Sequence, residues 1–187
     1  TYEARLLASR AAFQRQGYGD ARYYLTNLIN EPRCPDNSVF KEGAACCPRD
    51  IHYEALFAYG DVIMAEPTES SDRYVFARNA FERIVREFPE SPDVPAALGR
   101  MADCSVQLKL YADATNYYAA CLQHLRADIN QRSLAEIGLG QVLEKQAQTL
   151  PEAEQAPLLT AARAHYLNVL YQTNRREGEA NGTDPMI

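Results

Sequence analysis

The chain has 187 residues, of which 47% are hydrophobic, so it has enough length and apolar content for a packed core. Its formal net charge is −6, and its longest basic run is the pair Arg175–Arg176. Because phosphate binding depends on Lys and Arg, we expect no nucleic-acid binding. No stretch approaches the roughly 18 consecutive apolar residues of a membrane-spanning helix, so we expect no direct membrane insertion.

Helical periodicity runs through the whole chain, whereas alternating period-two runs are missing, which predicts an all-α fold. The predicted helices span residues 2–16, 18–30, 49–65, 71–88, 92–108, 111–126, 131–147 and 157–173. Thr149 and Glu152 have the spacing of a capping box, which predicts a short helix from residue 150. We expect Pro157 to break or kink it.

The stretch FERIVREFPESP, residues 81–92, predicts a helix end followed at once by a helix start. Phe88 precedes a proline and is therefore pushed out of the α region, which ends the first helix. Ser91 is suited to cap the next helix, with Pro92 at its first position. The stretch therefore predicts two helices joined by a tight turn.

The same residue pattern returns along the chain. A small residue, a large residue four positions later and another three positions after that recur in the second helix of each predicted pair, starting at Ala21, Ala77, Ala114 and Ala162. The first helices share a second pattern, a large residue followed four positions later by a small one, at Leu56/Gly60, Leu98/Ala102 and Leu134/Gly138. Small residues let two helices approach closely, and aromatic side chains fill the space beside them.

These patterns resemble the tetratricopeptide repeat (TPR), a helix-turn-helix unit of 34 residues. The resemblance implies an α-solenoid of about four antiparallel helix pairs over residues 1–173, with insertions around 31–48, 65–72 and 147–158. We expect residues 174–187 to be a polar tail that continues into a longer natural chain. The combination FERIVREFPES is similar to repeats of bacterial cell-envelope TPR proteins, which favours a periplasmic or cell-envelope location over the cytoplasm.

The resemblance further implies a non-catalytic scaffold that binds a peptide or a partner helix in a concave groove lined by the first helices. The groove-facing positions that it implies are Glu54, Phe57, Asp61, Asp103, Val106 and Gln107. Asp61 and Asp103 make this groove acidic, which favours a basic or polar partner segment. We expect no cofactor and no metal, and HExxH, P-loop and G-x-S-x-G signatures of enzymes are absent.

Two alternatives remain open. Cys34, Cys46, Cys47 and His52 gather in one predicted insertion, which is compatible with a thiol- or metal-dependent function. In the same segment, a disulfide from Cys34 to Cys46 or Cys47 and free thiols are equally compatible with the spacing. The second alternative is a purely structural segment of a larger protein.

Overall fold

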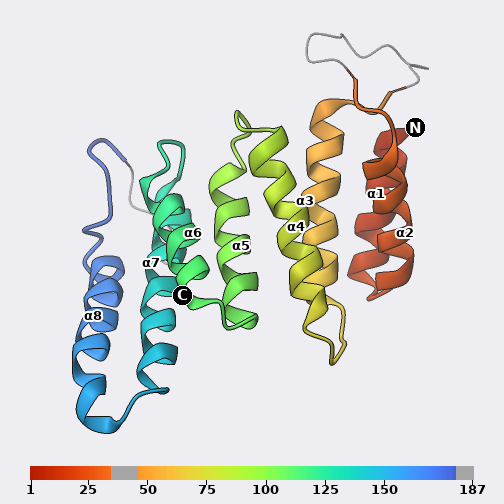
Figure 1. Ribbon diagram of the computed structural model, residues 1–187. Coiled ribbons are helices and arrows are strands. Elements are labelled where there is room, and N and C mark those ends of the chain that lie inside the picture. Colours follow the sequence, from red (N-terminus) through yellow and green to blue (C-terminus); the bar gives the residue numbers. More distant parts are fainter. Residues whose placement is uncertain (35–45, 180–187) are drawn as a thin grey trace. The chain divides into compact units, whose positions relative to one another are not determined.

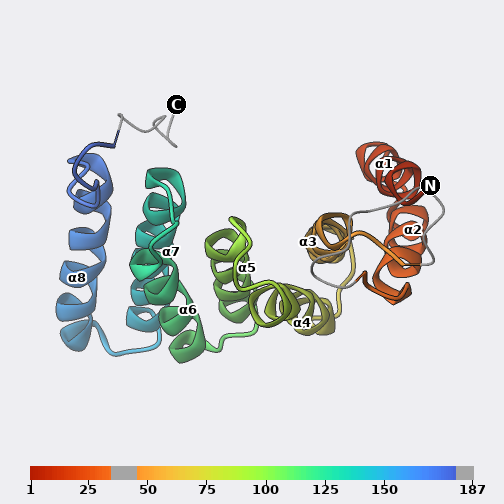
Figure 2. The same ribbon diagram turned by 90° about the horizontal axis from the view of Figure 1, so that it is seen from above.

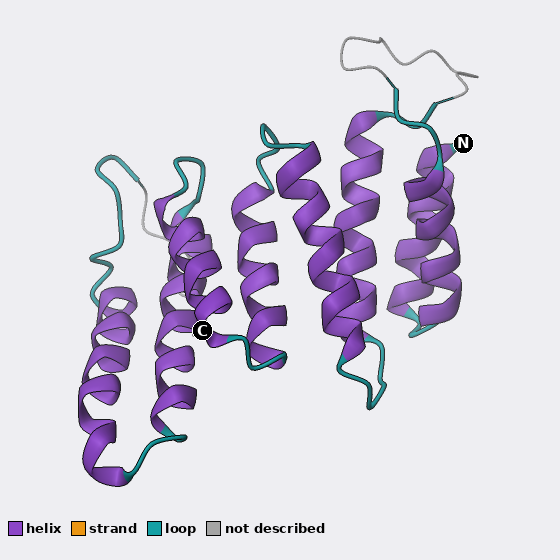
Figure 3. Ribbon diagram, viewed as in Figure 1, coloured by secondary structure: helices purple, strands orange, loops and turns teal. Residues whose placement is uncertain are grey.

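The computed structural model describes residues 1–34 and 46–179, and Figures 1 and 3 show helices joined by loops throughout these ranges. Eight α-helices occur in the described residues, which confirms the predicted all-α class. The chain divides into two compact units, Thr1–Pro89 (unit 1) and Glu90–Ile187 (unit 2). None of the described helices combines the length and the apolar character needed to cross a membrane.

Unit 1 contains two helical hairpins stacked on each other. Its helices are α1 (Tyr2–Gln14), α2 (Tyr18–Asn30), α3 (Arg49–Ala65) and α4 (Asp72–Glu87). α1 pairs with α2 and α3 with α4, while α3 also contacts both α1 and α2 (Figure 1). The fully buried side chains Leu25, Leu28, Leu56 and Phe81 form much of the core. These are the apolar positions of the predicted helical stripes.

The α3–α4 hairpin is held by a glycine that faces an aromatic ring. A Cβ atom added at Gly60 would lie only 2.4 Å from the ring of Phe81. Ala77, one turn before Phe81, is completely buried. The prediction that small residues allow close helix approach is confirmed here, because any side chain at Gly60 would collide with the ring.

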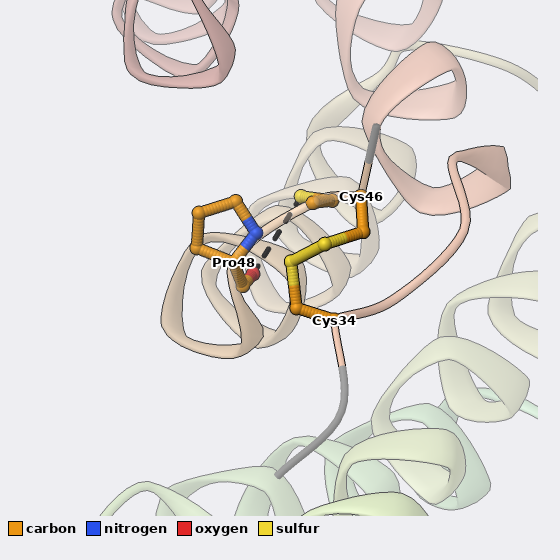
Figure 4. Close-up of a disulfide and its surroundings, with 4 residues drawn as sticks. Cys34, Cys46 and Pro48 are labelled. Atoms are coloured by element: carbon orange, nitrogen blue, oxygen red, sulfur yellow. Dashed lines mark hydrogen bonds between the residues drawn. A yellow bond between two sulfur atoms is a disulfide. The ribbon is translucent and has the colours of Figure 1, made fainter. Parts of the chain in front are cut away.

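A closed neck joins the two hairpins of unit 1 (Figure 4). Cys34 and Cys46 form a disulfide, which is one of the pairings that the sequence left open. Beside it, the Cys34 amide donates to the carbonyl of Cys47 (3.0 Å), and the Cys47 amide donates to that of Pro32 (2.7 Å). Residues 35–45 of the predicted insertion lie outside the described residues. The two chain segments that lead into and out of the insertion are therefore held together by one covalent bond and two hydrogen bonds.

Unit 2 repeats the arrangement with α5 (Val94–Gln107), α6 (Tyr111–Gln123), α7 (Ile129–Ala147) and α8 (Glu152–Leu170). α5 pairs with α6 and α7 with α8, and α7 also contacts α5 and α6. Figure 2 shows α7 between α8 and the α5–α6 pair. Asp128 caps α7 in a capping box with Gln131, which fixes the start of this helix.

The register of α7 differs from the prediction by two residues. The glycine that faces the ring of its own hairpin partner is Gly140, whose added Cβ would lie 2.5 Å from Tyr166 on α8. Gly138, predicted for this role, instead faces Tyr118 on α6, at 2.3 Å from an added Cβ. Leu134 is accordingly 59% exposed rather than packed. The prediction was wrong because α7 needs a small residue toward each of two neighbouring helices.

A segment after α8 folds back and binds the α6–α7 turn. The guanidinium of Arg176 donates to the carbonyls of Leu125 (2.7 Å) and His124 (3.0 Å). Arg132, buried on α7, donates to the carbonyl of Asn174 (3.0 Å) and pairs with the carboxylate of Glu179. We call residues 174–179 the strap. They belong to the stretch that the sequence assigns to a polar tail, and residues 180–187 lie outside the described residues.

Helix α8 begins at Glu152, five residues earlier than predicted, and continues through Pro157. The predicted capping box is absent, because Thr149 Oγ1 donates back to the carbonyl of Gln146 (2.7 Å) and Pro151 occupies the N-cap. Pro157 removes one helical donor, the one that would reach the carbonyl of Ala153. Ala153 is exposed, so water can satisfy that carbonyl and the helix persists.

Helix α5 also starts later than predicted. The Ser91 hydroxyl accepts from the amide of Asp93 (3.2 Å) in a local turn, and the helix begins at Val94 with Asp93 as N-cap. Pro95, rather than Pro92, stands in the first helical turn. Ser91 therefore makes the turn that precedes the helix and does not cap it.

Candidate functional site

The six residues implied as groove-facing are divided between the units, Glu54, Phe57 and Asp61 on α3 and the other three on α5. In unit 1, Glu54 forms an ion pair with Arg10 of α1 (2.7 Å). The Phe57 ring packs edge-on against Phe81, with ring centroids 5.3 Å apart. Asp61 is half-buried. Glu54 and Phe57 thus contribute to contacts between helices, whatever else they bind.

In unit 2, Asp103 and Val106 serve the interior of the unit. The hydroxyl of Tyr118 on α6 donates to Asp103 Oδ1 (2.6 Å), and Val106 is buried. Burial raises the pKa of Asp103, against the opposing effects of the Tyr118 hydrogen bond and the Arg100 charge. The Tyr118 contact therefore gives the Asp103 carboxylate a role in holding α5 against α6. Gln107 alone of these three is exposed.

The three cysteines of the predicted insertion are in different chemical states. The disulfide occupies the sulfur atoms of Cys34 and Cys46, and Cys47 is completely buried beside it, donating its thiol to the Pro48 carbonyl (3.6 Å; Figure 4). Burial, together with Glu31 and Asp50, raises the pKa of Cys47 to about 11. A thiol of that pKa is almost entirely protonated at neutral pH and is a poor nucleophile. Within the described residues no cluster of three or more potential metal ligands forms.

A small groove opens in unit 1 between α2 and α4, with α3 as its floor. It has a volume of about 220 Å³, and its lining includes Ile29, Asn30, Tyr59, Phe76, Asn79 and Arg83. Phe76 is 59% exposed, although it belongs to the apolar pattern of α4. Typical small-molecule pockets hold about 300–1,000 Å³, so this groove has room for a side chain or two rather than for a cofactor.

Arginine side chains gather at the end of this groove, where α2 and α4 terminate. Arg33, Arg83 and Arg86 all contact the carboxylate of Glu87, at 3.4, 3.0 and 3.2 Å. Burial acts to raise the pKa of Glu87, but the contacts from Arg83, Arg86 and Arg33 outweigh it and lower that pKa. We call these three arginines and Glu87 the arginine cluster. One carboxylate thus serves three guanidinium groups.

One arginine of the cluster, Arg33, lies over the ring of Phe88, the residue that follows α4. The guanidiniums of Arg33 and Arg49 each lie 5.2 Å from the Phe88 ring centroid, within cation–π range. The His52 ring is 5.9 Å from the same centroid and is buried, and neither of its ring nitrogens has a hydrogen-bond partner among the described residues. The Phe-Pro signal of the sequence therefore marks a residue that also orients cationic side chains.

Sequence reasoning missed this cluster because its arginines do not form a basic run in the sequence. Arg33 follows α2, whereas Arg83 and Arg86 lie on the last turns of α4, and the fold brings the three together. A weak signal was present, since Asn79, Arg83 and Arg86 have the spacing of one helix face.

No known family model, characterised protein or solved structure is significantly similar to this chain.

Proposed function

We propose that the chain is a TPR-like helical-repeat protein that binds a segment of a partner protein and catalyses no reaction. The repeat assignment is supported inside each unit, where the first helices of successive hairpins contact each other. It is also supported by Gly60 with Phe81 and Gly140 with Tyr166, which place a small residue and an aromatic ring at the same point of two hairpins.

The observation that carries the binding proposal is the groove of unit 1. Its floor and one wall are apolar, with Tyr59 half-buried and Phe76 exposed, and Asn30 and Asn79 stand on opposite walls. A peptide group offers one donor and one acceptor, and a side-chain amide matches both. An apolar floor between two amide-bearing walls suits one anchoring side chain of a peptide whose backbone is held at the rim.

The face implied by the resemblance remains a second part of the proposal. Of that set, Gln107 in unit 2 is exposed and Asp61 in unit 1 is half-buried. The cell-envelope setting also stays a proposal, and the Cys34–Cys46 disulfide agrees with it because disulfides persist in oxidising compartments. The thiol or metal alternative draws no support from a buried Cys47 and two cysteines joined to each other.

Selection from a phage-displayed library of short random peptides on the immobilised chain tests the groove. We expect enriched peptides whose binding is lost in Phe76→Asp, because a carboxylate in the groove opposes an apolar anchor. Tyr23→Asp is the matched control, since Tyr23 is a 66% exposed aromatic residue of unit 1 that does not line the groove. Asp61→Lys tests the other face in the same experiment.

The proposal fails if no peptide is enriched. It also fails for the groove if the enriched peptides bind Phe76→Asp and Tyr23→Asp equally well. Loss of binding in Asp61→Lys alone would move the binding surface to the face implied by the resemblance.

A further inference from the structure

We propose that the groove and the arginine cluster form one continuous docking site for an acidic peptide segment, in which an apolar side chain enters the groove and neighbouring carboxylates bind the arginines. This inference rests on the proposed function and names the chemistry of the partner. It differs from the basic partner that the acidic residues of the other helix face imply.

The groove leads directly into the cluster along two helices. On α4, Asn79 and Arg83 line the groove, and Arg86 lies one turn beyond Arg83 on the same face. On α2, Asn30 lines the groove at the last helical residue, and Arg33 follows three residues later. Arg83 belongs to both features, so a ligand that fills the groove toward its Arg83 end reaches guanidinium groups.

The charge at this end is unbalanced. Glu87 is the sole carboxylate in the described part of the chain that forms an ion pair with Arg33, Arg83 or Arg86. Glu82, adjacent to Arg83 in the sequence, pairs with none of them. A guanidinium has five N–H donors, and each of these arginines uses one of them on Glu87. Positive charge and unused donors therefore remain for the carboxylates of a partner.

The surroundings keep the guanidiniums in place before any partner arrives. Arg33 rests on the Phe88 ring, and Arg83 is bound to Glu87 four residues along the same helix. Both α2 and α4 end here, and the carbonyl ends of helices favour cations. His52 lies close enough for Arg83 and Arg33 to lower its pKa after the larger effect of burial, so it stays neutral beside them. An ordered set of donors costs a partner less to bind than a flexible one.

The composition of the selected peptides tests the inference. We expect the pool that depends on Phe76 to be enriched in Asp and Glu and depleted in Lys and Arg relative to the unselected library. Replacing each carboxylate of the best peptide by its amide should weaken binding about tenfold or more. Raising NaCl from about 50 to about 300 mM should weaken the acidic peptide more than its amide form, because salt screens exposed charges.

Variants of the chain locate the effect. Arg83→Gln/Arg86→Gln should weaken the acidic peptide about tenfold and leave its amide form within about twofold. Arg15→Gln removes one positive charge, as Arg86→Gln alone does, and is the control for that single variant. The Arg15 side chain follows α1, is 65% exposed and pairs with Asp20 of α2, so its loss should change binding less than about twofold. Where the double variant does not fold, Arg86→Gln alone serves, because the Arg86 side chain is 66% exposed. Arg86→Lys should restore most of the affinity.

The outcomes separate the two proposals. A pool that depends on Phe76 but is neutral or basic overturns the acidic partner and leaves the proposed function standing, whereas no enrichment at all overturns both. An equal loss in the arginine variant and in Arg15→Gln also overturns the acidic partner.

Discussion

Unit 1 and unit 2 use the same contact between helices and different devices at the chain connections. Gly60 faces Phe81 in unit 1, and Gly140 faces Tyr166 in unit 2, so both hairpins close on a glycine and an aromatic ring. The connection between the hairpins of unit 1 is closed by the Cys34–Cys46 disulfide. In unit 2 the strap binds the turn between α6 and α7 through guanidinium groups.

The difference shows that helix packing and loop closure are separate problems in this chain. Close packing between helices depends on small residues that face aromatic rings, and this pairing recurs in both units. Loop closure has no common solution here, because a covalent bond and a set of charge-assisted hydrogen bonds do the same work in different places. The two devices are also disrupted in different ways. Reductant opens the disulfide of unit 1, whereas replacing an arginine removes the contacts of the strap in unit 2.

Reduction of the disulfide should produce the largest difference between the units. The bridge spans a sequence separation of 12, and loop-closure entropy for a loop of this size is worth about 3 kcal/mol. We expect a phosphine reductant to lower the amide protection of unit 1 by about that amount and to leave unit 2 unchanged, as measured by hydrogen-exchange mass spectrometry.

A thiol titration in denaturant checks the premise of this prediction. Cys47, Cys104 and Cys121 are outside the disulfide, so their thiols should react before reduction, and those of Cys34 and Cys46 only after it. If all the cysteines react without reductant, or if reduction lowers protection equally in both units, the disulfide is not the device that distinguishes unit 1.

A methyl group at Gly60 should have the next largest effect. Gly60→Ala places a carbon 2.4 Å from the Phe81 ring, and overpacking of this kind costs about 1–3 kcal/mol against a gain of up to about 1 kcal/mol in helix propensity. We expect a net loss of roughly 1–2 kcal/mol in denaturant unfolding, seen in the amides of unit 1. The larger Gly60→Leu should cost more.

Gly99→Ala is the matched control, because nothing lies within 4 Å of an added Cβ at this position in α5. It should stabilise unit 2 by about 0.5–1 kcal/mol. Phe81→Leu should make Gly60→Ala less costly than it is in the parent, as a coupling between contacting residues requires. Equal behaviour of the two alanine variants would show that the glycine–ring contact does not set the hairpin spacing.

Loss of the strap should have a smaller effect that is confined to unit 2. Arg176→Gln removes the guanidinium that donates to the carbonyls of His124 and Leu125, at a cost of roughly 1 kcal/mol for exposed charge-assisted hydrogen bonds. We expect faster exchange near residues 122–127 and no change in unit 1. Arg163→Gln is the control, since Arg163 is exposed on α8. Unchanged exchange in the α6–α7 turn would mean that the strap does not stabilise it.

Mild acid should cause the smallest difference, and it should begin in unit 1. Burial and the charges of Arg83 and Arg33, opposed by Glu87, lower the pKa of His52 from the ordinary 6.5. The unfolded chain therefore binds this proton first, and unit 1 loses stability as the pH falls from 6.5 to the lowered value. Hydrogen bonds from Arg132 and Arg176 lower the pKa of Glu179, so the strap should persist until the pH falls below about 4.5.

Hydrogen exchange at pH 7.5 and at about pH 5.5, corrected for the intrinsic rate, measures this order. His52→Leu should remove the loss in unit 1 over that interval, because the group that binds the proton is gone. An equal loss of protection in both units, or a loss that survives His52→Leu, contradicts the assignment.

The helices of both units could be predicted because apolar periodicity records burial directly. The register of α7 could not, since Gly138 and Gly140 are two residues apart and only the positions of Tyr118 and Tyr166 decide which glycine faces which helix. The start of α8 could not be predicted either, because the cost of Pro157 depends on whether water reaches the carbonyl of Ala153, which has lost its helical donor.

The candidate site was harder to predict than the fold. The acidic residues of the first helices were visible in the sequence, but the bond from Tyr118 to Asp103 and the ion pair of Glu54 with Arg10 are long-range contacts. The arginine cluster is similarly assembled from residues on either side of α3 in the chain. The spacing of Asn79, Arg83 and Arg86 on one face of α4 was a weak local signal, and the contribution of Arg33 had none.

The neck of unit 1 makes the helical framework insensitive to what is inserted there. The Cα atoms of Cys34 and Cys46 are 4.9 Å apart, and hydrogen bonds to Pro32 and Cys47 hold the flanking chain. The entropy of closing a loop grows only with the logarithm of its length, and here the closure is already made. Segments of other lengths and sequences can therefore replace the one between these cysteines, which makes the neck a natural point for grafting a binding loop or a reporter.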